Sequence, residues 1–194
     1  MTLLHQQTKF NYMAKFPSFL SFVLDNPIRA FFTDRKNLIE KTGIREGMTI
    51  LEVGCGNGFF TPYLSKAVGK DGKIIAIDLQ KEMIEKLRGK IKREGLNHVE
   101  TIIGDIGEIN LLQTSIDFIF VYYCYHEFED KNGAVKKFKD VLKEQGSLFI
   151  AEPKFEVKLK RKEKMKKLLQ SEGFILSEEW ASLFSYYLRF KKKI

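Results

Sequence analysis

Short hydrophobic runs recur along the chain from residue 50 onward, without regular alternation of polar residues. They are rich in β-branched and aromatic side chains. A strand that has no polar face is buried on both sides, which is typical of a parallel sheet covered by helices. The sequence predicts five such strands: Ile50–Val53, Ile74–Ile77, Val99–Ile103, Ile116–Tyr123 and Leu148–Ala151.

Amphipathic segments separate these runs. Apolar residues recur at helical spacing over 60–68, 83–91 and 134–142, and Pro62 stands where the first turn of a helix tolerates proline. This alternation predicts an α/β fold: a doubly wound, Rossmann-like sheet, mostly parallel, with helices on both faces. Glycines that could end helices in a left-handed conformation follow helical patterns at Gly43, Gly69, Gly95 and Gly146.

The two ends of the chain depart from this alternation. Residues 174–182 and 185–190 have the composition of two strands with a short polar break, which predicts a C-terminal hairpin that adds an antiparallel strand to the sheet. The first 33 residues hold six of the 17 phenylalanines and predict one or two short helices, broken at Asn26–Pro27.

The composition is that of a folded protein of one domain. Of the 194 residues, 44% are apolar, and the 30% that are charged are scattered among the apolar runs. The early apolar run Phe16–Leu24 is shorter than the roughly 20 residues that span a bilayer, and no small-residue cleavage site follows it. We therefore expect no membrane span and a cytoplasmic location.

Charge and cysteine content narrow the classes of partner. The net charge of +8 is concentrated in residues 154–194, which hold twelve lysines and arginines against five glutamates. Cys55 and Cys124 allow one disulfide at most and do not pair with a histidine at a zinc spacing, so we expect no metal site and treat both as packing residues.

Three glycines at alternate positions follow the first predicted strand, in Ile50-Leu-Glu-Val-Gly-Cys-Gly-Asn-Gly-Phe-Phe60. Gly54, Gly56 and Gly58 would bring bare backbone close to a ligand at the start of a helix, and a simple bend needs fewer glycines. A dinucleotide fingerprint would need its third glycine at Phe59, and no Gly-Lys-Ser/Thr of a phosphate loop follows. The loop therefore favours a ligand other than NAD or a nucleoside triphosphate.

Three carboxylates lie at predicted strand ends. Asp78, twenty residues after Gly58, could accept both hydroxyls of a ribose, although it could also cap the helix that follows. Asp105 could accept from an adenine amine while the N–H of Ile106 donates to the ring, or it could only shape a turn. Glu52 would lie near an ammonium group. Three acids with no basic residues placed to bind phosphate favour a ligand made of adenosine and a positively charged group over one that contains a pyrophosphate.

These motifs resemble those of the class I S-adenosylmethionine-dependent methyltransferases, particularly the small-molecule and quinone-type group. Residues Glu52–Gly58 look like their first motif, and Ile75–Asp78 like their second-strand acid. Gly104–Ile106 looks like their adenine-contacting turn, and Ile116–His126 like their fourth strand and its loop. The match covers roughly residues 34–152, and ordered motifs are more specific together than singly.

The resemblance implies that S-adenosylmethionine is the cofactor. It implies one methyltransferase domain over residues 1–194, with an aromatic helical cap (1–33), a cofactor-binding core (34–152) and a basic helix with the C-terminal hairpin (153–194). A backbone carbonyl near Tyr122 would receive the methionine amine. The residues expected to contact the cofactor are Glu52, Gly54, Cys55, Gly56, Asn57, Gly58, Asp78, Leu79, Asp105, Ile106 and Tyr122.

Tyr125 and His126 are the candidate catalytic residues, because they follow the fourth strand, where open α/β sheets bind ligands. Core packing also explains tyrosines at this position. The resemblance places His126 near the methyl acceptor. A role for His126 as a general base is a hypothesis, since many methyl transfers need only proximity of the two reactants.

The phenylalanine-rich cap favours a small, apolar or aromatic acceptor. An amino group of a polymer is disfavoured, because the fourth motif reads Tyr122-Tyr-Cys-Tyr125 instead of Asn/Asp-Pro-Pro-Tyr. Residues Lys154–Lys167 hold eight lysines and arginines against two glutamates, which suits a solvated helix face but could also hold RNA or an anionic membrane. An RNA-modifying enzyme and a non-catalytic cofactor-binding module therefore stay open as alternatives.

Overall fold

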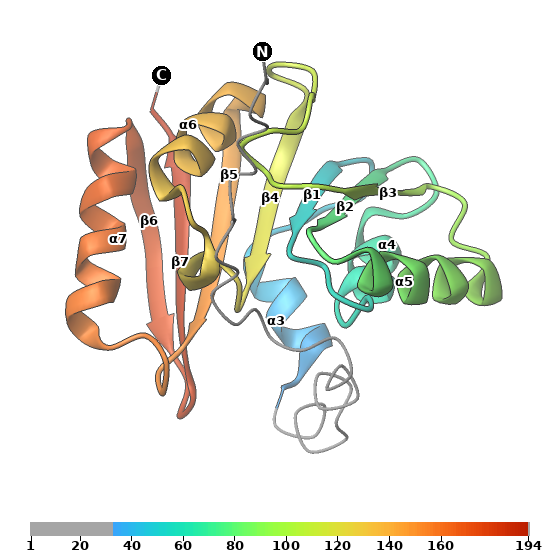
Figure 1. Ribbon diagram of the computed structural model, residues 1–194, viewed down its shortest axis with the longest axis horizontal. Coiled ribbons are helices and arrows are strands. Elements are labelled where there is room, and N and C mark those ends of the chain that lie inside the picture. The colour runs from blue at the N-terminus through green and yellow to red at the C-terminus, as the bar shows by residue number, and fades with distance from the viewer. Residues whose placement is uncertain (1–32, 194) are drawn as a thin grey trace, which may run out of the picture.

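A seven-stranded sheet forms the centre of the molecule in the computed structural model, which describes residues 33–193 (Figure 1). The strand order is β3-β2-β1-β4-β5-β7-β6. Strand β7 runs antiparallel to both of its neighbours, β5 and β6, and the pairs among β1 to β5 are parallel. The strands are β1 (Thr49–Val53), β2 (Lys73–Asp78), β3 (Val99–Ile103), β4 (Ile116–Tyr122), β5 (Leu142–Pro153), β6 (Phe174–Ala181) and β7 (Ser185–Lys192).

Helices cover both faces of this sheet. One hydrophobic core lies between the sheet and α3, α4 and α5, and a second lies under α6 and α7. Neighbouring residues of β1 serve the two cores in turn, with Ile50 in the first and Leu51 in the second. The predicted doubly wound α/β fold is confirmed. The helices are α3 (Arg35–Thr42), α4 (Thr61–Val68), α5 (Lys81–Glu94), α6 (Lys131–Val141) and α7 (Leu159–Ser171), with a 3-10 turn η2 (Tyr125–Glu127).

The fifth strand begins earlier than the sequence predicts. It starts at Leu142, directly after α6, so Gly146 lies inside β5 and the expectation that it ends a helix is wrong. A Cβ atom at Gly146 would lie 2.7 Å from Leu142 Cδ2 and 3.2 Å from the carbonyl oxygen of Asp117. The glycine therefore serves the close packing of β5 on β4.

Two of the other predicted helix-ending glycines adopt the left-handed conformation. Gly43 follows α3 and Gly95 follows α5, and the backbone N–H of each donates to a carbonyl of the last turn. Gly69 ends α4 with a positive φ but a ψ of −174°, so it is extended in ψ and is not left-handed helical. The helix ends of the first half are thus largely set by local sequence.

The C-terminal hairpin is confirmed, with β6 one residue shorter and β7 two residues longer than predicted. Strand β7 pairs with β5 from Ser147↔Lys191 to Pro153↔Ser185, which brings the turn between β6 and β7 beside the carboxyl end of β5. Residues 1–32, on which most of the expected aromatic cap falls, lie outside the described residues. Among the helices of residues 33–193, none combines the length and the apolar character needed to cross a membrane.

Candidate active site

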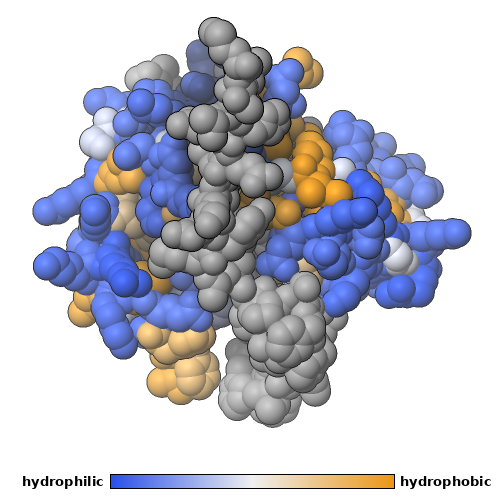
Figure 2. All heavy atoms as spheres, in the orientation of Figure 1, coloured by the Kyte–Doolittle hydropathy of each residue, from blue (hydrophilic) through white to orange (hydrophobic). Residues whose placement is uncertain are grey.

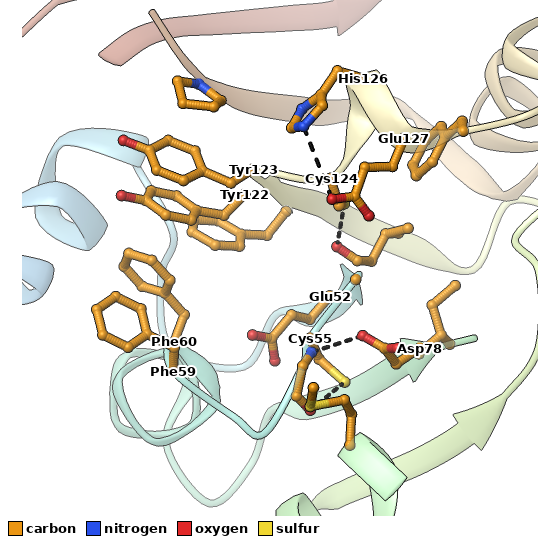
Figure 3. A pocket seen from close by; sticks show the side chains of 18 of the residues that line it. Glu52, Cys55, Phe59, Phe60, Asp78, Tyr122, Tyr123, Cys124, His126 and Glu127 are labelled. Atoms are coloured by element: carbon orange, nitrogen blue, oxygen red, sulfur yellow. Dashed lines mark hydrogen bonds and ion pairs between the residues drawn. The ribbon is translucent and has the colours of Figure 1, made fainter. Parts of the chain in front are cut away.

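A cavity of about 710 Å³ lies at the carboxyl ends of the parallel strands (Figure 3). Its walls come mainly from the loops that follow β1, β2, β3 and β4, from the segment at the end of β5, and from the β6–β7 turn with the start of β7. The carboxyl edge of an open α/β sheet is where such folds bind ligands, next to the point at which the strand order reverses. Here β1 lies between β2 and β4 at that point.

The glycine loop between β1 and α4 forms the floor of this cavity. The backbone N–H groups of Gly54 and Cys55 both donate to the carbonyl of Ile77, at 2.9 and 3.0 Å. The N–H of Gly56 donates to Asp78 Oδ2 at 2.9 Å. These bonds hold the loop against the end of β2, with positive φ angles at all three of its glycines.

The three glycines have different surroundings. A Cβ atom at Gly54 would lie 2.5 Å from Cys124 Sγ, so this glycine allows the loop to pack on the end of β4. One at Gly58 would lie 2.6 Å from Leu87 Cδ1 of α5. One at Gly56 would meet no atom within 4 Å, and Gly56 lines the cavity. Gly56 therefore leaves open the space that a ligand needs.

Glu52 lies in the cavity wall just before the loop and is almost fully buried. Burial raises the pKa of its carboxyl group to about 8, although the hydrogen bond from Thr61 and the charge of Lys90 oppose this. The hydroxyl of Thr61 donates to Glu52 Oε2 at 2.7 Å. The group can thus hold a proton near neutral pH, and a cation bound beside it would favour its charged form.

The other two predicted carboxylates also line the cavity. Asp78 accepts from Gly56 N through one oxygen and from Gln80 N, at 2.9 Å, through the other. Helix α5 has Gln80 and not Asp78 as its N-cap, so the alternative of a helix cap is wrong. Asp105 accepts from the N–H of Gly107 at 2.8 Å, and so shapes its turn as well as facing the cavity.

Aromatic rings form the opposite wall. The ring of Tyr122 lies 4.4 Å from that of Phe60 and 4.2 Å from that of Tyr123, centroid to centroid. Figure 3 shows these rings grouped on one side of the cavity, across from Glu52 and Asp78. Tyr123 has a φ of +58° and its hydroxyl is hydrogen-bonded to Ser185, so a strained residue joins β4 to the hairpin. We call the part of the cavity formed by Glu52, Asp78 and Asp105 its acidic end, and the part formed by the aromatic rings its aromatic end; Glu127 and Glu156 line the cavity beside His126.

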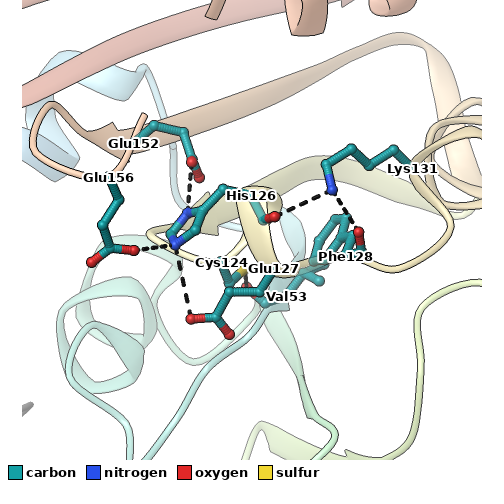
Figure 4. A network of polar contacts seen from close by, with 8 residues as sticks. All are labelled: Val53, Cys124, His126, Glu127, Phe128, Lys131, Glu152 and Glu156. Carbon is teal, nitrogen blue, oxygen red and sulfur yellow. Dashed lines mark hydrogen bonds and ion pairs between the residues drawn. The ribbon is translucent and has the colours of Figure 1, made fainter. Parts of the chain in front are cut away.

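His126 faces the cavity from η2 and is held between acidic side chains (Figure 4). Its Nδ1 lies 2.7 Å from Oε2 of Glu152, and its Nε2 lies 2.5 Å from Oε2 of Glu156. Glu127 Oε1 is farther from Nε2, at 3.9 Å. The ammonium group of Lys131 donates to the carbonyls of His126 and Phe128, which fixes this turn.

Electrostatic effects couple His126 to Glu152. Burial alone lowers the pKa of His126, but the hydrogen bond and the charge of Glu152, with the charge of Glu156, outweigh it and raise that pKa. Burial raises the pKa of Glu152, and His126 only partly reverses this. Within the described residues, no group of three acidic, histidine or cysteine side chains is arranged to hold a metal ion.

Burial raises the pKa of both cysteine thiols. Cys124 donates to the carbonyl of Val53 at 3.1 Å, and Cys55 is almost fully buried. A thiol with a raised pKa is a poor nucleophile at neutral pH. This agrees with the expectation that Cys55 and Cys124 are packing residues.

The cavity brings together ten of the eleven residues expected to contact the cofactor, and Gly58 is the exception. His126 also lines the cavity, whereas Tyr125 does not: it is buried against Phe128 in the core, with no hydrogen-bond partner for its hydroxyl among the described residues. The ten are Glu52, Gly54, Cys55, Gly56, Asn57, Asp78, Leu79, Asp105, Ile106 and Tyr122.

Sequence reasoning missed the contribution of β5 and the hairpin to the site. Glu152 and Pro153 end β5, and Glu156 follows in the next loop, at the start of the basic stretch Lys154–Lys167. The available signal for Glu152 was an acid directly after the apolar run Leu148–Ala151. Nothing local indicated that Ser182 and Phe184, in a turn far along the chain, would line the same cavity.

Comparison with known proteins shows similarity to methyltransferases. Residues 44–187 match a family model described as "Methyltransferase domain". A demethylmenaquinone methyltransferase of Staphylococcus aureus is 34% identical over 118 residues, which are 61% of this chain and 48% of that protein. The chain thus spans about half the length of the curated relatives it matches.

Solved structures agree with this match. A crystal structure of a SAM dependent methyltransferase from Aquifex aeolicus superimposes with a TM-score of 0.83 at 31% identity, and covers 91% of this chain and 99% of that one. A structure from Methanococcus maripaludis, described as a putative S-adenosyl-L-methionine-dependent methyltransferase, has a TM-score of 0.75 at 20% identity, which shows the shared fold alone.

Proposed function

The chain belongs to the S-adenosylmethionine-dependent methyltransferases, and from this we propose that it methylates a small, largely apolar acceptor that binds in the cavity beside the cofactor. The observation that carries the proposal is the division of one cavity into an acidic end and an aromatic end. The first suits a cationic cofactor and the second an apolar acceptor.

The residues of the acidic end fit S-adenosylmethionine. Gly56 leaves its Cβ space open, so the adenosine would approach the backbone of the loop there. Asp78 would bind the ribose hydroxyls and Asp105 the adenine amine, while Glu52 would lie near the ammonium group. When bound, the cofactor supplies a methyl group on a positively charged sulfur. The three carboxylates favour that charge, and they disfavour a pyrophosphate.

The aromatic end supports an acceptor of quinone type. Tyr122, Tyr123 and Phe155 offer flat apolar surfaces that suit an aromatic ring. The relative from Staphylococcus aureus is named for methylating demethylmenaquinone, which is consistent with this chemistry. The walls would hold the acceptor close to the methyl group and exclude water, which by itself supplies much of the rate enhancement.

His126 would take the proton that a hydroxyl of the acceptor loses. Its Nδ1 is engaged by Glu152, so Nε2 is the atom left to face the acceptor, once Glu156 has moved aside. Loss of that proton would make the oxygen of the acceptor, or the ring carbon conjugated with it, nucleophilic toward the methyl group that the bound cofactor would supply. If the ring carbon is methylated, the ring hydrogen that the methyl group replaces would return to the oxygen as a proton. Tyr125 has no part in this proposal, because it does not reach the cavity.

Calorimetric titration with S-adenosylmethionine, S-adenosylhomocysteine and NAD tests the cofactor assignment. We expect the first two to bind and NAD not to bind. Asp78→Ala should weaken binding at least about tenfold, because it removes the ribose acceptor and one support of the loop. Asp71→Ala, at an exposed position before β2, is the matched control. Preference for NAD, or equal loss in both variants, would contradict the proposal.

The acceptor class needs a second experiment. The protein would be incubated with S-adenosylmethionine and either a naphthoquinol that lacks a ring methyl group or a short RNA, and products would be identified by mass spectrometry. We expect a mass increase of one methyl group on the quinol alone. Methylation of the RNA would contradict the small-molecule proposal. Full activity in His126→Asn would contradict the role proposed for His126.

A further inference from the structure

Large apolar side chains are exposed beside the mouth of the cavity. Leu183 is 79% exposed, Phe155 66% and Phe184 46%. We call these three residues the apolar tip. Figure 2 shows apolar atoms gathered at the lower end of the molecule, over the turn between β6 and β7. Exposed apolar residues that are grouped in this way mark an interaction surface more often than residues that are exposed singly.

The two segments of the apolar tip are tied together. The backbone N–H of Lys154 donates to the carbonyl of Phe184 at 2.8 Å, and its ammonium group donates to the carbonyl of Ser182 at 2.5 Å. Pro153 pairs with Ser185 at the end of the sheet. The tip therefore stands on the rigid ends of β5 and β7.

Cations surround the apolar tip. Between residues 154 and 161 there are four of them, Lys154, Lys158, Lys160 and Arg161, against the single carboxylate of Glu156. The turn at residues 181–185 carries no charge. Lys160 and Arg161 lie in the first turn of α7 and are exposed. Apolar side chains with a basic rim match an interface that is apolar inside and anionic at its surface.

The apolar tip is continuous with the cavity. Phe155 and Phe184 line the cavity wall as well as the outer surface, and Ser182 and Ser185 line it beside them. A ligand leaving an apolar phase at the tip would thus enter along aromatic side chains.

From this arrangement we propose that the apolar tip docks the protein on an anionic lipid membrane, so that an apolar acceptor passes from the bilayer into the cavity. Leu183 and the two phenylalanines insert among the lipid chains, and the lysines and Arg161 contact the headgroups. The docking stands on the surface alone, whereas the passage of the acceptor also rests on the proposed function.

An RNA partner explains the surface less well. Lysines and arginine suit phosphates of either kind, but Leu183 has no ring on which a base could stack. Lys162 and Lys166 of α7 are paired with Glu179 of β6, so their charges are already neutralised within the protein. The exposed aliphatic side chain of Leu183 therefore favours a membrane over RNA as the partner of the apolar tip.

Co-sedimentation of the full chain with lipid vesicles tests the docking, without cofactor or acceptor. The vesicles would be phosphatidylcholine alone, or phosphatidylcholine mixed with phosphatidylglycerol. We expect binding to the mixed vesicles, weakened by salt. Leu183→Asp should reduce it at least about tenfold. The matched control is Leu112→Asp, since Leu112 is 80% exposed in the loop between β3 and β4.

The basic rim has its own pair of variants. Lys158→Gln with Lys160→Gln should reduce binding to the mixed vesicles about 30-fold, since each cation near an anionic surface contributes about 1 kcal/mol. Lys70→Gln with Lys92→Gln removes the same charge from exposed positions away from the tip and should have a small effect.

Three outcomes would overturn the docking proposal: absence of binding to mixed vesicles, equal loss in Leu183→Asp and Leu112→Asp, or displacement of the vesicles by single-stranded RNA. Calorimetric titration of Leu183→Asp with S-adenosylmethionine checks that the fold and the cofactor site are kept. Because docking is measured without the cofactor, a failure here is separate from a failure of the proposed methyl transfer.

Discussion

The Nδ1 atom of His126 lies 2.7 Å from Oε2 of Glu152, whose side chain is 1% exposed. Glu152 is the penultimate residue of β5 and pairs with Tyr186 of β7, directly after Ala151, which pairs with both β4 and β7. A buried carboxylate at this distance sets the orientation of the imidazole ring and favours a proton on Nδ1. Glu152 is thus a positioning residue for His126.

Replacing Glu152 should therefore change the pH dependence of methyl transfer. His126 accepts a proton only when it is neutral, so kcat/KM should rise with pH through the pKa of His126. Glu152 raises that pKa, and Glu152→Gln should move the rise to lower pH. The maximal rate should fall about 100-fold as the ring loses its orientation.

A matched variant separates this effect from a general loss of charge. Glu127→Gln removes a carboxylate 3.9 Å from the other ring nitrogen, and its effect on the profile should be smaller. Steady-state rates would be measured for wild type and both variants from about pH 5 to pH 9. An unchanged profile in Glu152→Gln would contradict the positioning role.

Glu52 should make the stability of the protein fall as pH rises. Its pKa is about 8 in the folded protein against 4.5 for the exposed group, so between these values the folded protein binds a proton that the unfolded chain has released. The free energy of unfolding then decreases with rising pH. Glu52→Gln should remove this decrease and gain about 1–3 kcal/mol relative to wild type between about pH 5 and pH 8.

Urea unfolding at several pH values measures this difference. Glu100→Gln is the control, because the side chain of Glu100 is 63% exposed and pairs only at the surface with Lys73. Its free energy of unfolding should follow that of wild type at every pH. A constant offset between Glu52→Gln and wild type would show that Glu52 is ionised throughout.

Gly56 and Gly47 allow backbone strain to be separated from ligand binding. Both have a positive φ, +55° and +79°, and neither has an atom within 4 Å of a Cβ position. Alanine at either site should cost about 1 kcal/mol of unfolding free energy. Only Gly56 lines the cavity, so only Gly56→Ala should weaken S-adenosylmethionine binding, which calorimetry would detect. Equal affinities in the two variants would place the cofactor elsewhere.

Much of the fold and of the cofactor end of the site could be predicted because the signals are local. A glycine loop between a strand and a helix, and acids at the ends of the next two strands, converge on one edge of any parallel sheet. The strands themselves were marked by runs with no polar face. Asp78 and Gly56 were named on spacing alone, and they are hydrogen-bonded to each other.

The rest depends on contacts between distant segments. Phe184 and Ser185 reach the cavity only because β7 inserts antiparallel beside β5, and no local pattern fixes that pairing. Tyr125 and His126 are neighbours in sequence, but they lie in a 3-10 turn, where successive side chains point in different directions. One therefore faces the core and the other the cavity, and proximity in sequence did not distinguish them.

Glu179 should stabilise the protein more than its exposure suggests, because it neutralises a buried cation. Lys162 is 8% exposed, its Nζ lies 2.5 Å from Glu179 Oε1, and it lies over the ring of Tyr186. Glu179→Ala would leave this cation with weaker partners and should cost about 1–3 kcal/mol of unfolding free energy. Hydrogen bonds from Lys162 and Lys166 lower the pKa of Glu179, so this stabilisation should be lost as pH falls through that lowered pKa.

Glu163 provides the comparison, since it contacts the same two lysines at 3.5 and 3.4 Å from a half-exposed position. Glu163→Ala should cost less than about 0.5 kcal/mol, because an exposed ion pair is screened by water. Urea unfolding at neutral pH would compare the two variants. Equal costs would mean that the burial of Lys162 carries no weight, and that α7 is held on β6 by apolar packing alone.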